Sequence, residues 1–187
     1  MEFNSYLDKS RLALDECSEA PIVSNIAKAL ESIIRILKNG NKILVCGNGG
    51  SASDASHIAG ELVGRFLLER DPLPVISLSA DTSVLTAWSN DYSYDEVFAR
   101  QIKALGNNGD LLLALSTSGN SKNVIKGAIQ AKDQSMMIIS LTGKKANKLS
   151  ELSDICIQAP STSTPIIQQC HQVFYHYLCL KIEEAFK

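Results

Sequence analysis

The sequence predicts an α/β protein: a doubly wound three-layer sandwich with a five-stranded parallel sheet, N-terminal helices and a long C-terminal helix. Short apolar runs of strand length alternate with amphipathic segments of helix length, as expected of strand–helix–strand units. Each run is apolar enough to be covered on both faces, which is typical of parallel sheets. No break in composition divides the chain, so we expect one domain over residues 1–187.

The expected elements follow in a regular order. Two N-terminal helices are predicted over about residues 2–17 and 21–39. The five predicted strands are Lys42–Cys46, Pro74–Leu78, Leu111–Leu115, Met136–Leu141 and Ile155–Gln158. The other predicted helices are Ser51–Phe66, Ser83–Trp88 with Tyr94–Leu105, Ser121–Asp133, Ala146–Ser153, and a long one over about 165–185. Ligands of such sheets bind beyond the carboxyl ends of the strands, near the point where strand order reverses.

Composition excludes several classes of function. The 18 lysines and arginines against 20 acidic residues give a net charge of −2, so the basic surface that nucleic-acid binding requires is missing. The five cysteines form no CxxC pair and are odd in number, which favours a reducing compartment. The N-terminus does not have the pattern of a signal peptide, and no apolar stretch could span a bilayer. We expect a soluble, cytoplasmic protein that binds neither nucleic acid nor membranes.

The segment 46–62 joins a strand end, a glycine-rich turn and a helix. Gly47, Gly49 and Gly50 permit backbone geometry that a Cβ would obstruct, so a ligand can approach the main chain there. The helix that follows, from Ser51, offers unpaired N–H groups and the positive end of its dipole. This turn therefore predicts a site for an anion.

A second turn, residues 116–121 with the sequence STSGNS, follows the third predicted strand and precedes a helix. Its hydroxyl groups and the backbone donors at the helix start could hold a phosphate group, although serine and threonine are also ordinary helix caps. No GxxxxGK[ST] motif occurs, which disfavours a nucleotide triphosphatase. A phosphorylated small molecule remains as the expected ligand.

His57 and Glu61 lie one turn apart on one face of a predicted helix. They could share a metal ion, or the carboxylate could act as a general base; a solvated helix face is the simpler alternative. In the last helix, Gln168, Gln172 and His176 form one stripe, and His176 with either glutamine could complete the site. Spacing does not choose between the glutamines, and a core histidine with glutamines facing another subunit would also explain them.

The pair Asn90-Asp91 is expected in a loop after the second strand's helix. Its polar side chains could hold sugar hydroxyls. The same dipeptide is ordinary turn chemistry, and local evidence favours that reading.

In this order, the motifs CGNGGSASDASHIAGEL, Asn90-Asp91, STSGNS, SLTG at 140–143 and IQQCHQVFYH at 167–176 resemble those of the phosphoheptose isomerases. These are sugar isomerase (SIS) domain proteins, and the likeness covers nearly the whole chain. The resemblance implies the conversion of sedoheptulose 7-phosphate to D-glycero-D-manno-heptose 7-phosphate through an enediol. This is the first step of ADP- or GDP-heptose biosynthesis for lipopolysaccharide or related glycans.

The resemblance also implies a set of site residues. Glu61 would be the base and His176 the proton shuttle, in a homotetramer with sites between subunits and one zinc ion per subunit. The implied zinc ligands are His57, Glu61, Gln168 and His176, so the likeness favours Gln168 over Gln172. The implied substrate-binding residues are Asn48, Gly49, Gly50, Ser51, Glu61, Asn90, Asp91, Ser116, Thr117, Ser118, Ser121 and Gln168.

Three alternatives compete with this assignment. Non-catalytic SIS relatives that bind a replication-initiator partner lack the glutamate at the place of Glu61 and the final histidine, and both are present here. A sugar-phosphate sensor usually carries a DNA-binding domain, for which 187 residues leave no room. An isomerase of hexose or pentose phosphates is separated from a heptose enzyme only by the resemblance itself.

Overall fold

The computed structural model describes residues 2–187 and contains one five-stranded sheet in which every neighbouring pair is parallel. The strand order is β2-β1-β3-β4-β5. The strands are β1 (Ile43–Cys46), β2 (Val75–Ser77), β3 (Leu111–Ser116), β4 (Met137–Gly143) and β5 (Ile155–Ala159). The predicted fold class is therefore confirmed, with all five strands at the predicted places.

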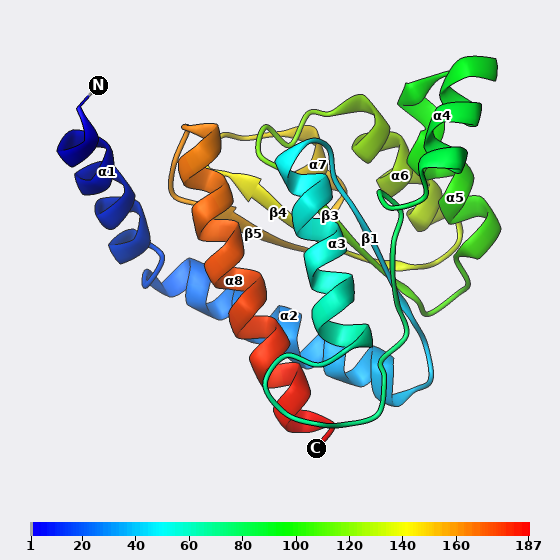
Figure 1. The fold of residues 1–187 in the computed structure, drawn as a ribbon, viewed down its shortest axis with the longest axis horizontal. Helices are drawn as coiled ribbons and strands as arrows, with labels where there is room; N and C mark the ends of the chain where they lie inside the picture. Colours follow the sequence, from blue (N-terminus) through cyan, green and yellow to red (C-terminus); the bar gives the residue numbers. More distant parts are fainter. Residues whose placement is uncertain (1) are drawn as a thin grey trace.

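Helices cover both faces of the sheet, and α3 and α8 lie side by side across it (Figure 1). The helices before β3 are α1 (Phe3–Glu16), α2 (Ala20–Lys38), α3 (Gly50–Val63), α4 (Thr82–Asp91), the 3₁₀ turn η1 (Tyr94–Glu96) and α5 (Val97–Leu105). Those after β3 are α6 (Lys122–Asp133), α7 (Lys148–Leu152) and α8 (Thr164–Ala185). No helix within residues 2–187 is both long enough and apolar enough to cross a membrane.

The alternation of side chains along the strands divides the core in two. Odd-numbered residues of β1 and β3, such as Val45 and Leu113, pack with α2, α3 and α8 on one face. Even-numbered residues, such as Leu44 and Leu112, pack with α5, α6 and α7 on the other. Both faces of these central strands are buried, which explains their uninterrupted apolar sequence.

Three local expectations are corrected. Strand β2 has only one neighbour, and Ile76 is 38% exposed, so this edge strand is not covered on both faces. Helix α3 ends at Val63 instead of Phe66, because the chain turns away at Gly64. Asn90 and Asp91 lie in the last turn of α4 instead of a loop, because that helix runs past Trp88.

The sheet topology places the two predicted turns next to each other. Strand β1 has β2 on one side and β3 on the other, so strand order reverses between β1 and β3. The turn after β1 leads to α3 on one face, and the turn after β3 leads to α6 on the opposite face. The two turns diverge over this switch point, which is where ligands bind in open parallel sheets.

Candidate active site

A pocket of about 290 Å³ lies at this switch point, between the two turns and the first turns of α8. Most of its walls are backbone, hydroxyl and amide groups. It is lined by Asn48, Gly49, Gly50, Ser51, Leu115, Ser116, Thr117, Ser121, Thr164 and Gln168. Eight of the residues predicted to bind substrate are therefore together in this pocket.

The glycines of the first turn are required by close contacts. A Cβ on Gly47 would lie 2.5 Å from the carbonyl oxygen of Ser51, and one on Gly50 would lie 2.5 Å from Nε2 of Gln168. Gly49, the residue before α3, has a φ of 55°, which side chains disfavour. The turn therefore brings the start of α3 against Gln168 of α8 with no side chain between them.

The second turn presents several hydroxyl groups. The Ser116 and Ser121 oxygens are 3.2 Å apart, and the Gly119 N–H donates to the Ser116 oxygen. Ser51, at the start of α3, is buried beside the same pocket. Hydroxyl donors and a helix N-terminus suit the oxygens of a phosphate group, although the pocket contains no lysine or arginine.

The Asn48 side chain faces the protein instead of standing free. It exchanges two hydrogen bonds of 2.8 Å with the side chain of Asn123, and its oxygen also accepts from the Tyr94 hydroxyl. These contacts join the turn after β1 to the first turn of α6 and to η1. Sequence reasoning did not find Asn123 or Tyr94, because nothing local links them to residue 48.

His57, Glu61 and His176 form a second cluster between α3 and α8. One ligand atom from each residue can be chosen so that all three lie within 4.8 Å of one another. His57 Nε2 is 2.8 Å from Glu61 Oε1, and the side chain of His57 is 45% exposed. Two imidazole nitrogens and a carboxylate oxygen at this spacing form a possible metal-binding group, as His57 and Glu61 on one helix face predicted.

A layer of buried side chains supports this cluster. The ring of Phe66 stacks on His176, and the edge of Tyr175 meets both His57 and His176. The Tyr175 hydroxyl is 3.1 Å from His57 Nδ1 and 3.3 Å from Asp54 Oδ1. Burial raises the pKa of Asp54, although the hydrogen bond from Tyr175 acts to lower it. Burial and the nearby charge of Asp54 raise the pKa of Tyr175. Asp54 and Tyr175 were not predicted; each is one turn or less from a predicted ligand, which is the only local signal.

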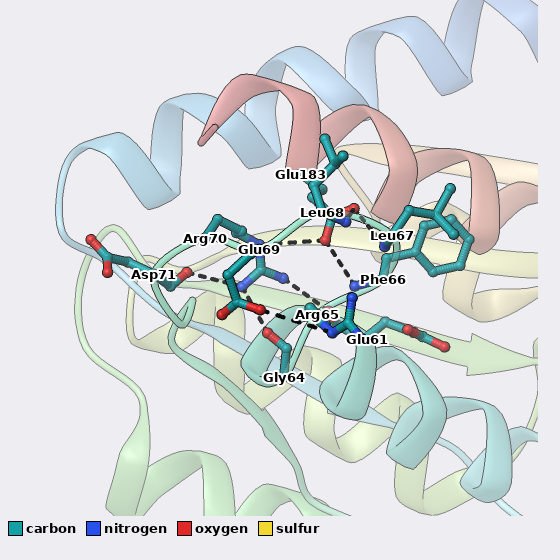
Figure 2. A network of polar contacts seen from close by, with 10 residues as sticks. All are labelled: Glu61, Gly64, Arg65, Phe66, Leu67, Leu68, Glu69, Arg70, Asp71 and Glu183. Atoms are coloured by element: carbon teal, nitrogen blue, oxygen red, sulfur yellow. Dashed lines mark hydrogen bonds and ion pairs between the residues drawn. The ribbon is translucent and has the colours of Figure 1, made fainter.

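The segment after Glu61 is held in place by Glu183 of α8 (Figure 2). Its carboxylate accepts hydrogen bonds of 2.7–2.8 Å from the backbone N–H groups of Phe66, Leu67 and Leu68. Arg70 lies beside it and donates to the carbonyl oxygen of Glu61 and to that of Gly64. The C-terminal end of α3, with Glu61, is thereby fixed against α8, which carries His176.

The remaining polar residues of α8 occupy different places. Gln168 lines the pocket, whereas Gln172 is exposed and interacts with Asp54. His171 is fully buried, and its Nε2 is 3.2 Å from the carbonyl oxygen of Thr142. His171 is thus a core histidine bonded to a backbone carbonyl, an alternative that the sequence had left open for this helix.

Asn90 and Asp91 do not join either group of residues in this chain. The Asn90 amide donates to the Asp91 carboxylate, and both side chains are exposed on α4. Neither residue lines the pocket. Their predicted contact with substrate stays a prediction.

Comparisons with known proteins concern the chain as a whole. The model of the SIS domain family matches residues 5–143. A phosphoheptose isomerase of Helicobacter pylori (strain P12) is 49% identical over 185 residues, which is 99% of this chain and 94% of that protein. This chain belongs to the phosphoheptose isomerase family. A second family member, from Shewanella halifaxensis, is also 49% identical and matches 97% of this chain and 93% of its own length.

Solved structures of phosphoheptose isomerases agree with this membership. The structure from Francisella tularensis has a TM-score of 0.93 and that from Neisseria gonorrhoeae one of 0.91. Each is 38% identical, with 97% of this chain and 96% of the other chain covered. The family assigned from the ordered motifs is therefore confirmed. The likeness to these structures extends to the long C-terminal helix α8, which lies beyond the match to the SIS model.

Proposed function

We propose that this phosphoheptose isomerase family member interconverts sedoheptulose 7-phosphate and D-glycero-D-manno-heptose 7-phosphate. The observation that carries the proposal is the cluster of His57, Glu61 and His176 on the same two helices, α3 and α8, that border the pocket. An aldose–ketose isomerase needs a base at the reacting carbons and a binding site for the distant phosphate. The cluster supplies the base, and the pocket supplies the binding site for the phosphate.

A zinc ion, one per subunit, is proposed at the cluster, held by His57, Glu61 and His176 with Gln168 as fourth ligand. The donor set supports it, because zinc takes imidazole nitrogen and carboxylate oxygen and their atoms lie within 4.8 Å. When bound, zinc would supply Lewis-acid stabilisation of negative charge that develops on the sugar oxygens. Gln168 is included because the family resemblance implies it, and its side chain lines the pocket beside Gly50.

The proton transfers are assigned to Glu61 and His176. Once the sugar ring has opened, Glu61 takes the proton from C1 of the ketose, the carbonyl oxygen at C2 gains a proton, and the enediol forms. Glu61 then returns its proton to C2 while the C1 hydroxyl loses one and becomes the aldehyde. His176 would carry the proton between the two oxygens. A carboxylate of ordinary basicity suffices only where the developing charge is stabilised.

Phosphate binding is proposed in the pocket, at Ser51 and the second-turn hydroxyls Ser116, Thr117 and Ser121. Ser118 belongs to the same turn but lines a neighbouring pocket, and its contact with the phosphate stays part of the proposal. The backbone of Gly49 and Gly50, and Asn48, would contact the sugar. Asn90 and Asp91 would contribute from a neighbouring subunit, because both are exposed on α4 and away from their own pocket.

A homotetramer is proposed because the family resemblance implies one, and an apolar groove of about 490 Å³ between α2 and α8 supports contact between copies of the chain. Val23, Val173 and Tyr177 line it and are 45–51% exposed in the single chain. Apolar patches of this kind mark protein–protein contacts more often than free surface. Assembly through α8 would bring several copies of the helix that carries His176 close together.

The test follows sedoheptulose 7-phosphate by carbon-13 NMR with purified protein, after chelation and again after zinc is returned. We expect the aldose signal only with zinc, and a loss of at least about a hundredfold in Glu61→Gln, as for removal of a general base. Glu69→Gln, at a carboxylate whose side chain is 90% exposed, is the matched control. Near-normal turnover by folded Glu61→Gln would show that Glu61 is not the base.

A silent His176→Gln would likewise remove the proton shuttle from the mechanism. If no metal supports any product, the isomerase proposal itself fails. The protein would then be better explained as a non-catalytic SIS protein that binds a partner or senses a sugar phosphate.

A further inference from the structure

A buried chain of hydrogen bonds lies behind His57. The Tyr175 hydroxyl of α8 is 3.1 Å from His57 Nδ1 and 3.3 Å from Asp54 Oδ1, and both of those residues belong to α3. Tyr175 is 1% exposed and Asp54 5% exposed, so water does not compete for these bonds. The opposite nitrogen of the same imidazole faces Glu61.

The number of available protons determines which atom donates in each of these hydrogen bonds. A phenol has one proton to donate, and an ionised carboxylate only accepts. With Asp54 ionised, the Tyr175 proton goes to Asp54, and the Tyr175 oxygen accepts from His57. That arrangement requires the proton of the neutral imidazole to be on Nδ1, which leaves Nε2 with a lone pair.

The consequence appears on the exposed side of the ring. The unprotonated Nε2 and the Glu61 carboxylate oxygen are both acceptors, and they lie 2.8 Å apart. Two acceptors at this distance repel each other unless a proton or a metal ion lies between them. A metal ion satisfies both atoms, so the buried hydrogen bonds prepare the exposed pair to receive one.

We propose that Tyr175 and Asp54 are positioning residues that hold His57 in its Nδ1-protonated form and orient it as a metal ligand. This inference rests on the metal site of the proposed function and adds two residues to it. Outer partners of this kind commonly change metal affinity by 10- to 100-fold. Neither residue would touch the metal or the substrate.

Packing and hydrogen bonding at Tyr175 can be separated by substitution. The ring of Tyr175 packs edge-on against His57 and His176, and Tyr175→Phe keeps that ring while removing the hydroxyl. Leucine branches where aspartate does, so Asp54→Leu keeps the shape and removes the acceptor. In Asp54→Leu the Tyr175 proton has no acceptor left except His57 Nδ1, which favours the tautomer that cannot bind metal through Nε2.

The test measures zinc affinity of the full-length protein by competition with a chromophoric chelator. We expect Tyr175→Phe to bind zinc about 10- to 100-fold more weakly than the unmodified chain. Asp54→Leu should bind still more weakly. The double variant should recover to the level of Tyr175→Phe, because without the phenol nothing stabilises the wrong tautomer.

The control is Tyr92→Phe, which removes the hydroxyl of an exposed tyrosine directly after α4. Helix α4 packs on the face of the sheet opposite to α8. Circular dichroism and thermal unfolding in chelator check that each variant is folded. Unchanged zinc affinity in Tyr175→Phe, or losses that simply add in the double variant, would overturn the inference while leaving the isomerase proposal intact. A wild-type chain that binds no zinc would overturn the inference together with the zinc site of the proposed function.

Discussion

Two histidines of α8, His171 and His176, show how position decides the chemistry of one residue type. His176 is half-buried in the candidate metal cluster, whereas His171 is enclosed in the core. Burial lowers the pKa of His171 to about 4, against the hydrogen bond to the Thr142 carbonyl, which raises it. His171 therefore stays neutral in the folded protein over most of the physiological range.

The lowered pKa makes stability depend on pH. An unfolded histidine titrates near pH 6.5, so between about pH 6.5 and 4 the unfolded chain binds a proton that the folded chain does not. Above that window the contribution of His171 is complete, and through it stability falls by about 3 kcal/mol. Denaturant unfolding at a series of pH values should show this loss in the unmodified chain and not in His171→Gln. Parallel pH curves for the two proteins would contradict the assignment.

At the scale of elements, the segment 64–72 connects the end of α3 to the edge strand without regular structure, yet it is firmly bonded. Glu183 accepts three backbone N–H groups of this segment, and Arg70 donates to three carbonyl oxygens around it (Figure 2). Burial alone would raise the pKa of Glu183, but the three N–H groups and Arg70 hold it below the ordinary range. The Glu183 carboxylate thus accepts the backbone hydrogen bonds that a helix or strand would otherwise accept in this segment.

We expect Glu183→Gln to lower the free energy of unfolding by about 2–4 kcal/mol, because the amide places donors against N–H groups and leaves Arg70 without a counter-charge. Urea unfolding near neutral pH measures the change. The control is Glu184→Gln, whose exposed pair with Lys181 should contribute at most about 1 kcal/mol. Equal effects of the two substitutions would mean that the bonds to residues 66–68 do not stabilise the fold.

The same carboxylate gives a pH signature. Since its pKa is lowered on folding, its contribution is present above the ordinary glutamate pKa near 4.3 and is lost as pH falls below it. Glu183→Gln should therefore differ most from the unmodified chain near neutral pH. The difference should shrink in acid.

At the scale of the whole molecule, the groove between α2 and α8 is the feature that a single chain leaves unfilled. Val173→Glu would place a charge in the middle of this apolar surface, and burying it in an interface would be costly. We expect light scattering to show a tetramer for the unmodified chain and smaller species for Val173→Glu. Ile129→Glu, at an equally exposed apolar residue on the other side of the sheet, is expected to stay assembled.

Val173→Glu is expected to lose activity when it loses the tetramer, because Asn90 and Asp91 are proposed to reach a neighbouring subunit's pocket. Isomerase assays over a range of protein concentrations would detect this as a loss of specific activity on dilution. Full activity in a monomer would exclude a shared site.

Local sequence patterns were enough to predict the fold class, the five strands and the family. Strands such as the predicted Leu111–Leu115 are continuous apolar runs because both faces are buried, and that pattern is local. His57 and Glu61 were likewise found by helical spacing, since residues four apart share a helix face. No single motif was specific enough to assign the family. The assignment depended on five weak motifs that occur in a fixed order.

The packing of α3 against α8, by contrast, could be read only from the folded chain. Tyr175 and His57 are separated by 118 positions, and Glu183 and Phe66 by 117, so neither contact has a signature in local spacing. Spacing also could not separate Gln168, which lines the pocket, from Gln172, which does not. Periodicity tells which residues share a face of one helix; which faces then come together depends on how the helices pack across the sheet.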